Sequence, residues 1–231
     1  MIITIDGPAG SGKSAAAQGL AKRLQMAHLD TGAMYRAVAL DALEQGLTDP
    51  DAIAARARLL TLGFDWTRTP AAMLLNGRDV SDLIRQPRVT EVTWRAADNP
   101  LVRGVLVAQQ RAIGRAAGSL VTEGRDQGTI VFPDAAFKFY LDAKPDERAR
   151  RRIAQLRSKG VEVDPTEILR QLIARDQRDA GRVVGPLARP RDAIVLDTTE
   201  MTLEQVISAM ERIIGEGSAR PRPQAARGGR S

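Results

Sequence analysis

The sequence predicts an α/β protein in which helices cover a mostly parallel β-sheet. Short β-rich segments alternate with longer helical segments along the chain, and this alternation is typical of parallel sheets. The first β-rich segment, residues 2–5, runs directly into a glycine-rich segment. An alanine-rich helical stretch, residues 14–25, follows at once, so the chain opens with a strand, a tight loop and a helix.

Local patterns predict the other elements. Pro145, followed by two acids, is typical of a first helical turn, and Asp164 stands where a helix cap is expected. Asn76-Gly77 is a strong hairpin signal, so a small antiparallel patch is expected within residues 64–80. The remaining strands are predicted at 120–123, 129–132, 137–141 and 194–196, and the remaining helices at 31–45, 51–62, 88–97, 102–117, 145–157, 164–181 and 203–214.

Composition excludes several classes of protein. The 231 residues suffice for a full core in one or two domains, with 43% hydrophobic and 27% charged residues. The chain has no Cys and a single His, His28, which excludes disulfide scaffolds, thiolate zinc sites and multi-histidine metal sites. Since neither a membrane-spanning apolar run nor a signal peptide is evident, a soluble cytoplasmic protein is expected.

The positive charge is unevenly distributed. The formal net charge is +6, but four Arg lie in residues 218–231, a tail without acids that we expect to be disordered. The charge therefore gives no reason to expect a specific nucleic-acid partner. Arg accounts for 29 of the 34 basic residues, which reflects either genome composition or sites for planar, bidentate recognition of phosphate.

The glycine-rich segment is the most specific motif. Residues 7–14 match G-x-x-x-x-G-K-[ST] in full, after a strand and before a helix, so a chance glycine-rich turn is a weak alternative. In such a P-loop, backbone N–H groups and the lysine hold phosphates while the hydroxyl binds Mg²⁺. The motif predicts a site for Mg²⁺ and a nucleoside triphosphate, with Ser14 as metal ligand, at Gly7, Pro8, Ala9, Gly10, Ser11, Gly12, Lys13, Ser14 and Ala15.

One helical stripe changes from apolar to charged. Ile168 and Leu172 share a helix face with Arg175, Asp179 and Arg182, because the spacing is +4, +3, +4 and +3. Charges on an inward stripe must be paired or bound to a ligand. The stripe fits a ligand with phosphate and hydroxyl groups, or a structural ion-pair network, and the spacing leaves both open.

The helix at 145–157 carries a row of Arg. Arg148, Arg151 and Arg152 share one face. Such a row is usually solvated, with Glu147 available to pair with Arg151, and this interpretation is favoured on the row alone. The alternative is a mobile cationic lid over a transferring phosphoryl group.

Two polar turns complete the candidate sites. Thr31 is placed to cap the helix that carries Arg36, which would make a second anion site, although an ordinary cap with a surface Arg is common. Residues 123–126, Glu-Gly-Arg-Asp, follow a predicted strand end, where open α/β sheets bind ligands, or form a simple polar turn.

Together these segments resemble the bacterial cytidylate kinase family, whose members phosphorylate CMP and dCMP. The resemblance spans nearly the whole chain except the tail, in the family's order. Its most specific blocks are Asp-Thr-Gly-Ala-Met-Tyr-Arg at 30–36 and Gly-Arg-Asp-Gln-Gly-Thr at 124–129. The other matching segments are 3–14, 146–152, 175–179, 186–187, 192–193 and 196–199.

The resemblance implies a P-loop NTPase-type fold with a five-stranded parallel sheet. It implies one cytidylate kinase domain, residues 1–217, expected as a monomer, with a core made by residues 1–31, 118–145 and 183–217. An NMP-binding part with an antiparallel insertion would occupy residues 32–117, and a helical lid residues 146–182. The activity implied is transfer of a phosphoryl group from ATP, with Mg²⁺, to CMP or dCMP, which gives ADP and CDP or dCDP.

The resemblance also implies residue roles. Arg36 and Arg125 would hold the acceptor phosphate, while Thr31, Arg103 and Asp126 would lie near the base. Arg175 and Asp179 would contact the phosphate and the ribose, and Arg182 would complete this network. Arg148 and Arg152 would be lid arginines that reach the transferred group. The catalytic set is then Lys13, Arg36, Arg125, Arg148, Arg152, Arg175 and Arg182.

The chain departs from the family pattern at two positions. Trp94, or Thr93 if the register slips by one, stands where many relatives place a Ser for base contact. Gln127 stands where an aliphatic residue is usual. The first departure puts one base contact in doubt without affecting the phosphate site.

Three alternative functions stay open at the level of sequence. Another P-loop small-molecule kinase, for adenylate, guanylate or shikimate, would differ in its acceptor. A GTPase-type switch would need a guanine reader, but Ala143-Lys144-Pro145-Asp146 lacks the amide side chain that reads guanine. A nucleic-acid-binding protein would act through the basic tail, with salt-dependent affinity.

Overall fold

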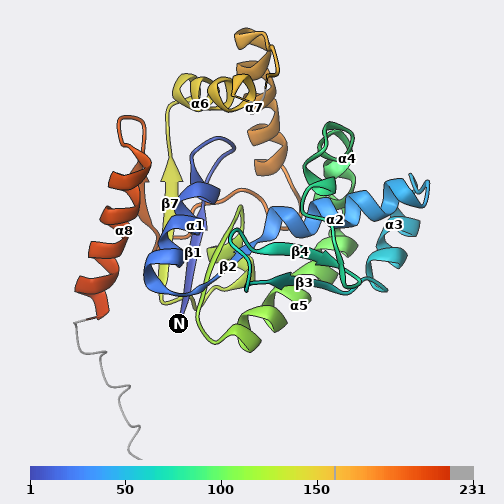
Figure 1. The fold of residues 1–231 in the computed structure, drawn as a ribbon, viewed down its shortest axis with the longest axis horizontal. Coiled ribbons are helices and arrows are strands. Elements are labelled where there is room, and N and C mark those ends of the chain that lie inside the picture. Colours follow the sequence, from blue (N-terminus) through green and yellow to red (C-terminus); the bar gives the residue numbers. More distant parts are fainter. Residues whose placement is uncertain (159, 219–231) are drawn as a thin grey trace, which may run out of the picture.

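The computed structural model in Figure 1 describes residues 1–158 and 160–218. It has the predicted α/β architecture: a five-stranded parallel sheet with helices on both faces, and a three-stranded antiparallel sheet to one side. No helix of the described part is long and apolar enough to cross a membrane. Residues 219–231, most of the predicted tail, lie outside the described residues.

The parallel sheet places β1 (Ile2–Asp6) at its centre. β6 (Leu120–Gly124) and β7 (Phe137–Asp142) flank β1, while β2 (Ala27–Asp30) and β8 (Ile194–Asp197) form the edges. Since all four pairings are parallel, the carboxyl ends of the strands meet at one edge of the sheet. The P-loop follows β1 at this edge.

Helices cover the two faces of the sheet unequally (Figure 1). α1 (Lys13–Leu24) and α8 (Leu203–Ser218) share one core with alternate residues of β1, such as Ile3 and Ile5. The other core is larger and joins the opposite face to the residue 32–117 segment. That segment contains α2 (Thr31–Glu44), α3 (Pro50–Ala57), α4 (Pro87–Ala97) and α5 (Pro100–Ala117).

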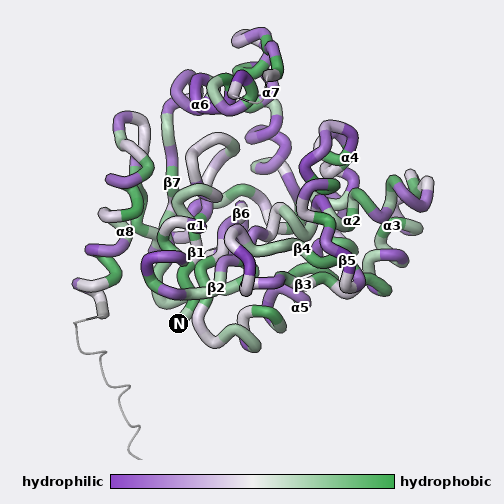
Figure 2. Tube along the Cα trace, in the orientation of Figure 1, coloured by the Kyte–Doolittle hydropathy of each residue, from purple (hydrophilic) through white to green (hydrophobic). Residues whose placement is uncertain are grey.

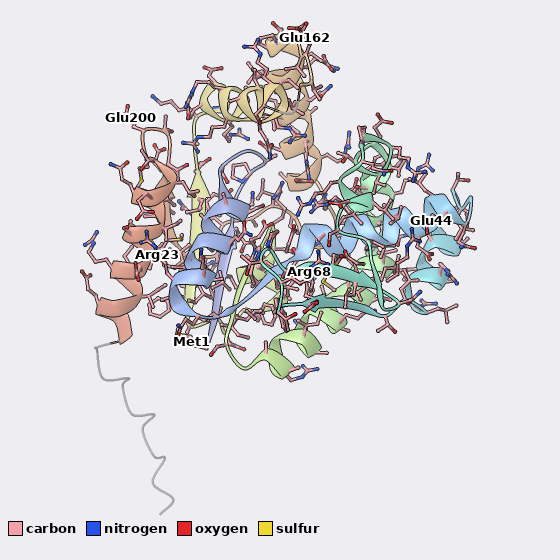
Figure 3. The ribbon with its side chains drawn as sticks, in the orientation of Figure 1. Met1, Arg23, Glu44, Arg68, Glu162 and Glu200 are labelled. Atoms are coloured by element: carbon pink, nitrogen blue, oxygen red, sulfur yellow. The ribbon has the colours of Figure 1, made fainter. Side chains whose placement is uncertain are left out.

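A network of ion pairs and hydrogen bonds on the outside of the smaller core joins α1 to α8. Arg23 of α1 reaches toward α8 (Figure 3) and donates to Ser208 Oγ and to Glu211 Oε2, each at 3.0 Å. Glu204 is a further partner of Arg23. These contacts are exposed, so packing of the apolar faces supplies most of the stability.

The antiparallel sheet confirms the predicted hairpin. β3 (Leu62–Asp65) pairs with β4 (Ala72–Leu75), and β4 pairs with β5 (Arg78–Asp79). Asn76 and Gly77 connect β4 and β5 with φ values of 50° and 82°, as the tight turn requires. The helix predicted at 51–62 ends earlier than expected, since β3 already begins at Leu62.

Two expectations about the parallel sheet were wrong. The segment 129–132 is not a strand, because Gln127–Val131 forms a π-helical turn in which Phe132 N–H donates to Gln127 O at 2.7 Å. The fifth strand of the sheet is β2 instead, and no strand was predicted there. Leu29 is its only buried residue and gives little signal in the sequence.

Two helices form the predicted lid segment. α6 (Pro145–Arg157) and α7 (Pro165–Ala180) stand beyond the carboxyl edge of the sheet, above the P-loop in Figure 1. Glu162, in the connection between them, marks the far end of this segment (Figure 3). Movement of the lid stays a prediction. The last helix, α8, runs to Ser218. It extends beyond the predicted end at residue 214 and into the first residue of the predicted tail.

Candidate active site

The P-loop presents a set of free backbone donors. Among the described residues, the N–H groups of Gly10, Gly12, Lys13, Ser14 and Ala15 have no protein acceptor. Gly7 lets the loop turn close to β7, since a Cβ there would lie 2.0 Å from the carbonyl oxygen of Leu141. Converging N–H groups at a helix N-terminus favour an anion such as phosphate.

Lys13 and Ser14 lie at the start of α1. The Lys13 ammonium donates to Pro8 O at 2.7 Å, and burial, with Arg125 adding to it, lowers its pKa to about 7. The Ser14 hydroxyl donates to Glu123 Oε1 at 2.8 Å. Glu123 comes from the end of β6, so this strand supplies a carboxylate directly beside the P-loop.

A cluster of Arg125, Asp179 and Arg182 lies next to the P-loop. Arg125 Nε donates to Asp179 Oδ2 at 2.8 Å, and Arg182 bonds the other oxygen of the same carboxylate. Burial would raise the pKa of Asp179, but the two guanidinium groups outweigh it and hold the pKa below its usual value. Arg182, two residues beyond the end of α7, also donates to Asp98 Oδ1 at 2.6 Å, which connects the turn after α7 to the end of α4.

Arg175 faces the same cluster from α7. Its Nε lies 4.0 Å from Asp179 Oδ2, and 52% of its side-chain surface is exposed. Desolvation, with repulsion from Arg125 and Arg36, nevertheless lowers its pKa to about 10. With a pKa of about 10, the Arg175 side chain stays cationic at neutral pH. The structure thus brings together Arg175, Asp179 and Arg182, the charged residues of the predicted stripe.

Arg103 and Asp126 form a buried pair. Their side chains are 2% and 4% exposed, and Arg103 also donates to Ala97 O at 2.9 Å. The Arg103 guanidinium lies 5.2 Å from the centre of the Tyr35 ring. Burial is the main reason that the pKa of Tyr35 rises to about 12, so the phenol stays neutral.

Thr31 and Arg36 begin α2 on the other side of β6. Asp30, not Thr31, caps this helix, because Asp30 Oδ1 accepts the N–H of Ala33 at 2.8 Å. The expected cap was therefore wrong by one residue. Thr31 instead donates its hydroxyl to Glu123 O at 2.7 Å, and Arg36 donates to Asp30 Oδ2 at 3.0 Å.

The arginines of α6 differ from each other in their surroundings. Arg148 is buried and donates to Ala143 O at 3.0 Å and to Ala9 O at 2.8 Å, so it binds protein groups rather than facing open space. Arg151 pairs with Glu147 and donates to Thr198 Oγ1 at 3.0 Å. Arg152 is exposed, donates to Gln155 and forms no ion pair within the described residues.

The two positions that depart from the family pattern lie in different surroundings. The Thr93 hydroxyl donates to Val89 O at 2.7 Å within α4, while Trp94 is 47% exposed. Gln127 is buried, where its amide oxygen accepts from Thr122 Oγ1 at 2.9 Å and its amide nitrogen donates to Gln110 Oε1 at 3.3 Å. The added amide is thus accommodated by polar partners.

Several residues around the site were not assigned from the sequence. Asp6 ends β1 and accepts the N–H groups of Gln127 at 2.9 Å and Gly128 at 2.7 Å, which holds the turn after Asp126. Burial raises the pKa of Asp6 to about 7. Asp98 and Asp176 bind arginines that are distant in the chain. The sequence offered a signal for Asp6, directly before the P-loop, and for Asp176, within the matching segment 175–179, but none for Asp98.

Comparisons with known proteins show the family of the chain. The chain is 45% identical to a cytidylate kinase of Carboxydothermus hydrogenoformans over 93% of this chain and 97% of that one. It is 44% identical to a cytidylate kinase of Azotobacter vinelandii, with 95% and 96% covered.

An uncharacterized protein from Eubacterium ventriosum has a related fold, at a TM-score of 0.50, 14% identity, and 95% and 99% coverage. Such a distant likeness shows the fold alone. The family model for cytidylate kinase matches residues 3–216. The chain therefore belongs to the cytidylate kinase family.

Proposed function

We propose that this protein transfers the γ-phosphoryl group of ATP to CMP or dCMP, which gives ADP and CDP or dCDP. The single observation that carries the proposal is the position of the Arg125–Asp179–Arg182 cluster directly beside a P-loop, in a chain of this family. A P-loop alone would fit many kinases and switches. A second cluster of cations next to it fits a second phosphate.

The donor nucleotide would bind the free N–H groups of the P-loop within Gly7–Ala15. Lys13 would reach the β- and γ-phosphates. No group of three His, Cys, Asp or Glu within the described residues could hold a metal ion, so Mg²⁺ would be shared between the Ser14 hydroxyl and the nucleotide's own oxygens. The oxygen-only donors Ser14 and Glu123 fit this hard cation, which supplies neutralisation of phosphate charge when bound.

The acceptor nucleotide would bind on the opposite side of the cluster. Arg36, Arg125 and Arg175 would hold its phosphate, with Asp179 accepting from the ribose and Arg182 orienting Asp179. The base would lie near Thr31 and the pair formed by Arg103 and Asp126. Arg152, which is free of ion pairs among the described residues, would reach the transferred group from the lid.

Catalysis would then consist of positioning and charge neutralisation. The acceptor is a phosphate monoester whose oxygen is already anionic, so no strong general base is required. Closure of the lid helices would exclude water and suppress hydrolysis of ATP. The cytoplasmic location and the monomeric state stay predictions.

The first experiment is ADP release from Mg²⁺·ATP with CMP, dCMP, UMP, AMP, GMP or no acceptor. Turnover with CMP and dCMP far above the others is expected. Turnover of another monophosphate would keep a P-loop kinase but overturn the choice of cytosine. Hydrolysis without any acceptor would overturn the kinase function itself.

A further inference from the structure

One contact between the lid helices and the P-loop uses backbone groups of Ala9 that the proposed phosphate binding does not require. Asp176 of α7 accepts the N–H of Ala9 at 2.9 Å, while Arg148 of α6 donates to the carbonyl oxygen of Ala9 at 2.8 Å. Arg148 and Asp176 also pair with each other. The two backbone groups flank the same Cα atom, so the pair fixes both φ and ψ at Ala9.

Apolar packing reinforces this contact. Figure 2 shows hydrophilic residues over much of α6 and α7. Their apolar side chains nevertheless form a small core from Ala149, Ile168 and Leu172, and this core includes the methyl group of Ala9. The P-loop thus contributes a residue to the interior of the lid.

The backbone of α6 also lies directly against Gly10. A Cβ at Gly10 would lie 3.1 Å from Arg148 Cβ and 3.2 Å from Arg148 O. The φ of Gly10 is +78°, a value that favours glycine. The helix and the loop therefore approach as closely as the absence of a side chain allows.

The contact leaves the phosphate-binding groups free. It uses the N–H and C=O of Ala9, whereas the N–H groups of Gly10 and of residues 12–15 have no acceptor within the described part of the chain. A contact that blocked ATP would be expected to occupy those donors. The geometry instead suits a loop held ready for the triphosphate.

We propose that Asp176 and Arg148 form a latch on Ala9 that holds the P-loop in its ATP-binding conformation and docks the lid on it. Asp176 is then a positioning residue for the donor nucleotide, and Arg148 acts through Ala9 rather than on the transferred group. The role of the lid rests on the proposed kinase function, whereas the effect on the P-loop requires only that the loop binds ATP.

The test compares two substitutions. Asp176→Ala removes the acceptor of the Ala9 N–H and the partner of Arg148. Asp176→Asn keeps an acceptor for the Ala9 N–H but loses the charge facing Arg148. Glu167→Gln is the matched control, because Glu167 lies on the same helix in an exposed ion pair with Arg170. The dissociation constants of Mg²⁺·AMP-PNP and of CMP are measured separately by calorimetry, with thermal melting of each variant.

Loss of these two part-buried, charge-assisted contacts is expected to weaken AMP-PNP binding about tenfold in Asp176→Ala, and less in Asp176→Asn. Binding of CMP alone should change less than about twofold, on the scale of an exposed pair. Glu167→Gln should leave both constants at the wild-type values.

Unchanged or tighter AMP-PNP binding would overturn the latch, and so would equal weakening of both ligands, which is the signature of a merely structural role. If Asp176→Ala does not fold, Asp176→Asn decides by the same criterion. Failure of wild-type protein to bind CMP would count against the proposed function and would leave the AMP-PNP comparison intact.

Discussion

Arg125→Ala is expected to cause a large loss of catalysis. Arg125 Nε donates to Asp179, and Nη1 makes a long contact of 3.3 Å with Gly124 O. One edge of the guanidinium is therefore left for phosphate oxygens. A charge-assisted contact of this kind contributes about 1.5–3 kcal/mol. Losing it in the transition state corresponds to a fall in kcat of about 10- to 150-fold.

The assay is steady-state ADP release at saturating Mg²⁺·ATP with CMP varied. Arg125→Lys is the control, because it keeps the charge but not the planar fork, and an intermediate rate is expected. Asp179 keeps Arg182 as a partner in both variants, so stability should fall only by about 1–3 kcal/mol, measured by denaturant unfolding. A kcat/KM within about twofold of wild type in a folded Arg125→Ala protein would refute the assignment.

Three further results are expected. Asp179→Ala should weaken CMP more than ATP in separate titrations, and equal losses would contradict the ribose role. Because burial lowers the pKa of Lys13 to about 7, its side chain is mostly a neutral amine above that pH and must take up a proton to bind phosphate as an ammonium. The dissociation constant of AMP-PNP should therefore rise with pH above about 7, with proton uptake in calorimetry, and a flat profile would count against this pKa. Gly10→Ala should reduce AMP-PNP binding at least about tenfold, since its Cβ meets α6. Gly46→Ala, with φ of +66°, open space around its Cβ and a position outside the P-loop, should not, so a similar loss there would show that the effect is not specific to the P-loop.

The strands show which local patterns suffice for prediction. β1 and β7 are buried, β-rich segments, and their patterns predicted them to within a residue. β2 was missed because Leu29 is its only buried residue, so its place in the sheet depends on pairing with β6. The segment 129–132 looked like a strand, yet Arg111 binds the carbonyl oxygens of Ile130 and Val131, and Asp6 holds the N–H of Gly128 just before it, in a π-helical turn.

The residues of the candidate site also differ in how well local sequence patterns predicted them. Helical spacing alone placed Arg175, Asp179 and Arg182 together, and the structure confirms that they meet. Their partners could not be found in this way, since Asp98 lies 84 residues from Arg182. Arg148 shows how far helical spacing can predict the surroundings of a residue. Its helix face was predicted, but its burial against Ala9 depends on the packing of α7.

The indole of Trp66 gives this protein an optical reporter of its own. Trp66 follows β3 of the antiparallel sheet, is 38% exposed and donates its Nε1–H to His28 O on the edge strand β2 at 2.9 Å. This bond joins the insertion to the main sheet two residues before Asp30, the partner of Arg36. In a Trp94→Phe protein Trp66 is the only fluorophore of its kind, so its emission would follow any separation of the two sheets while the acceptor enters.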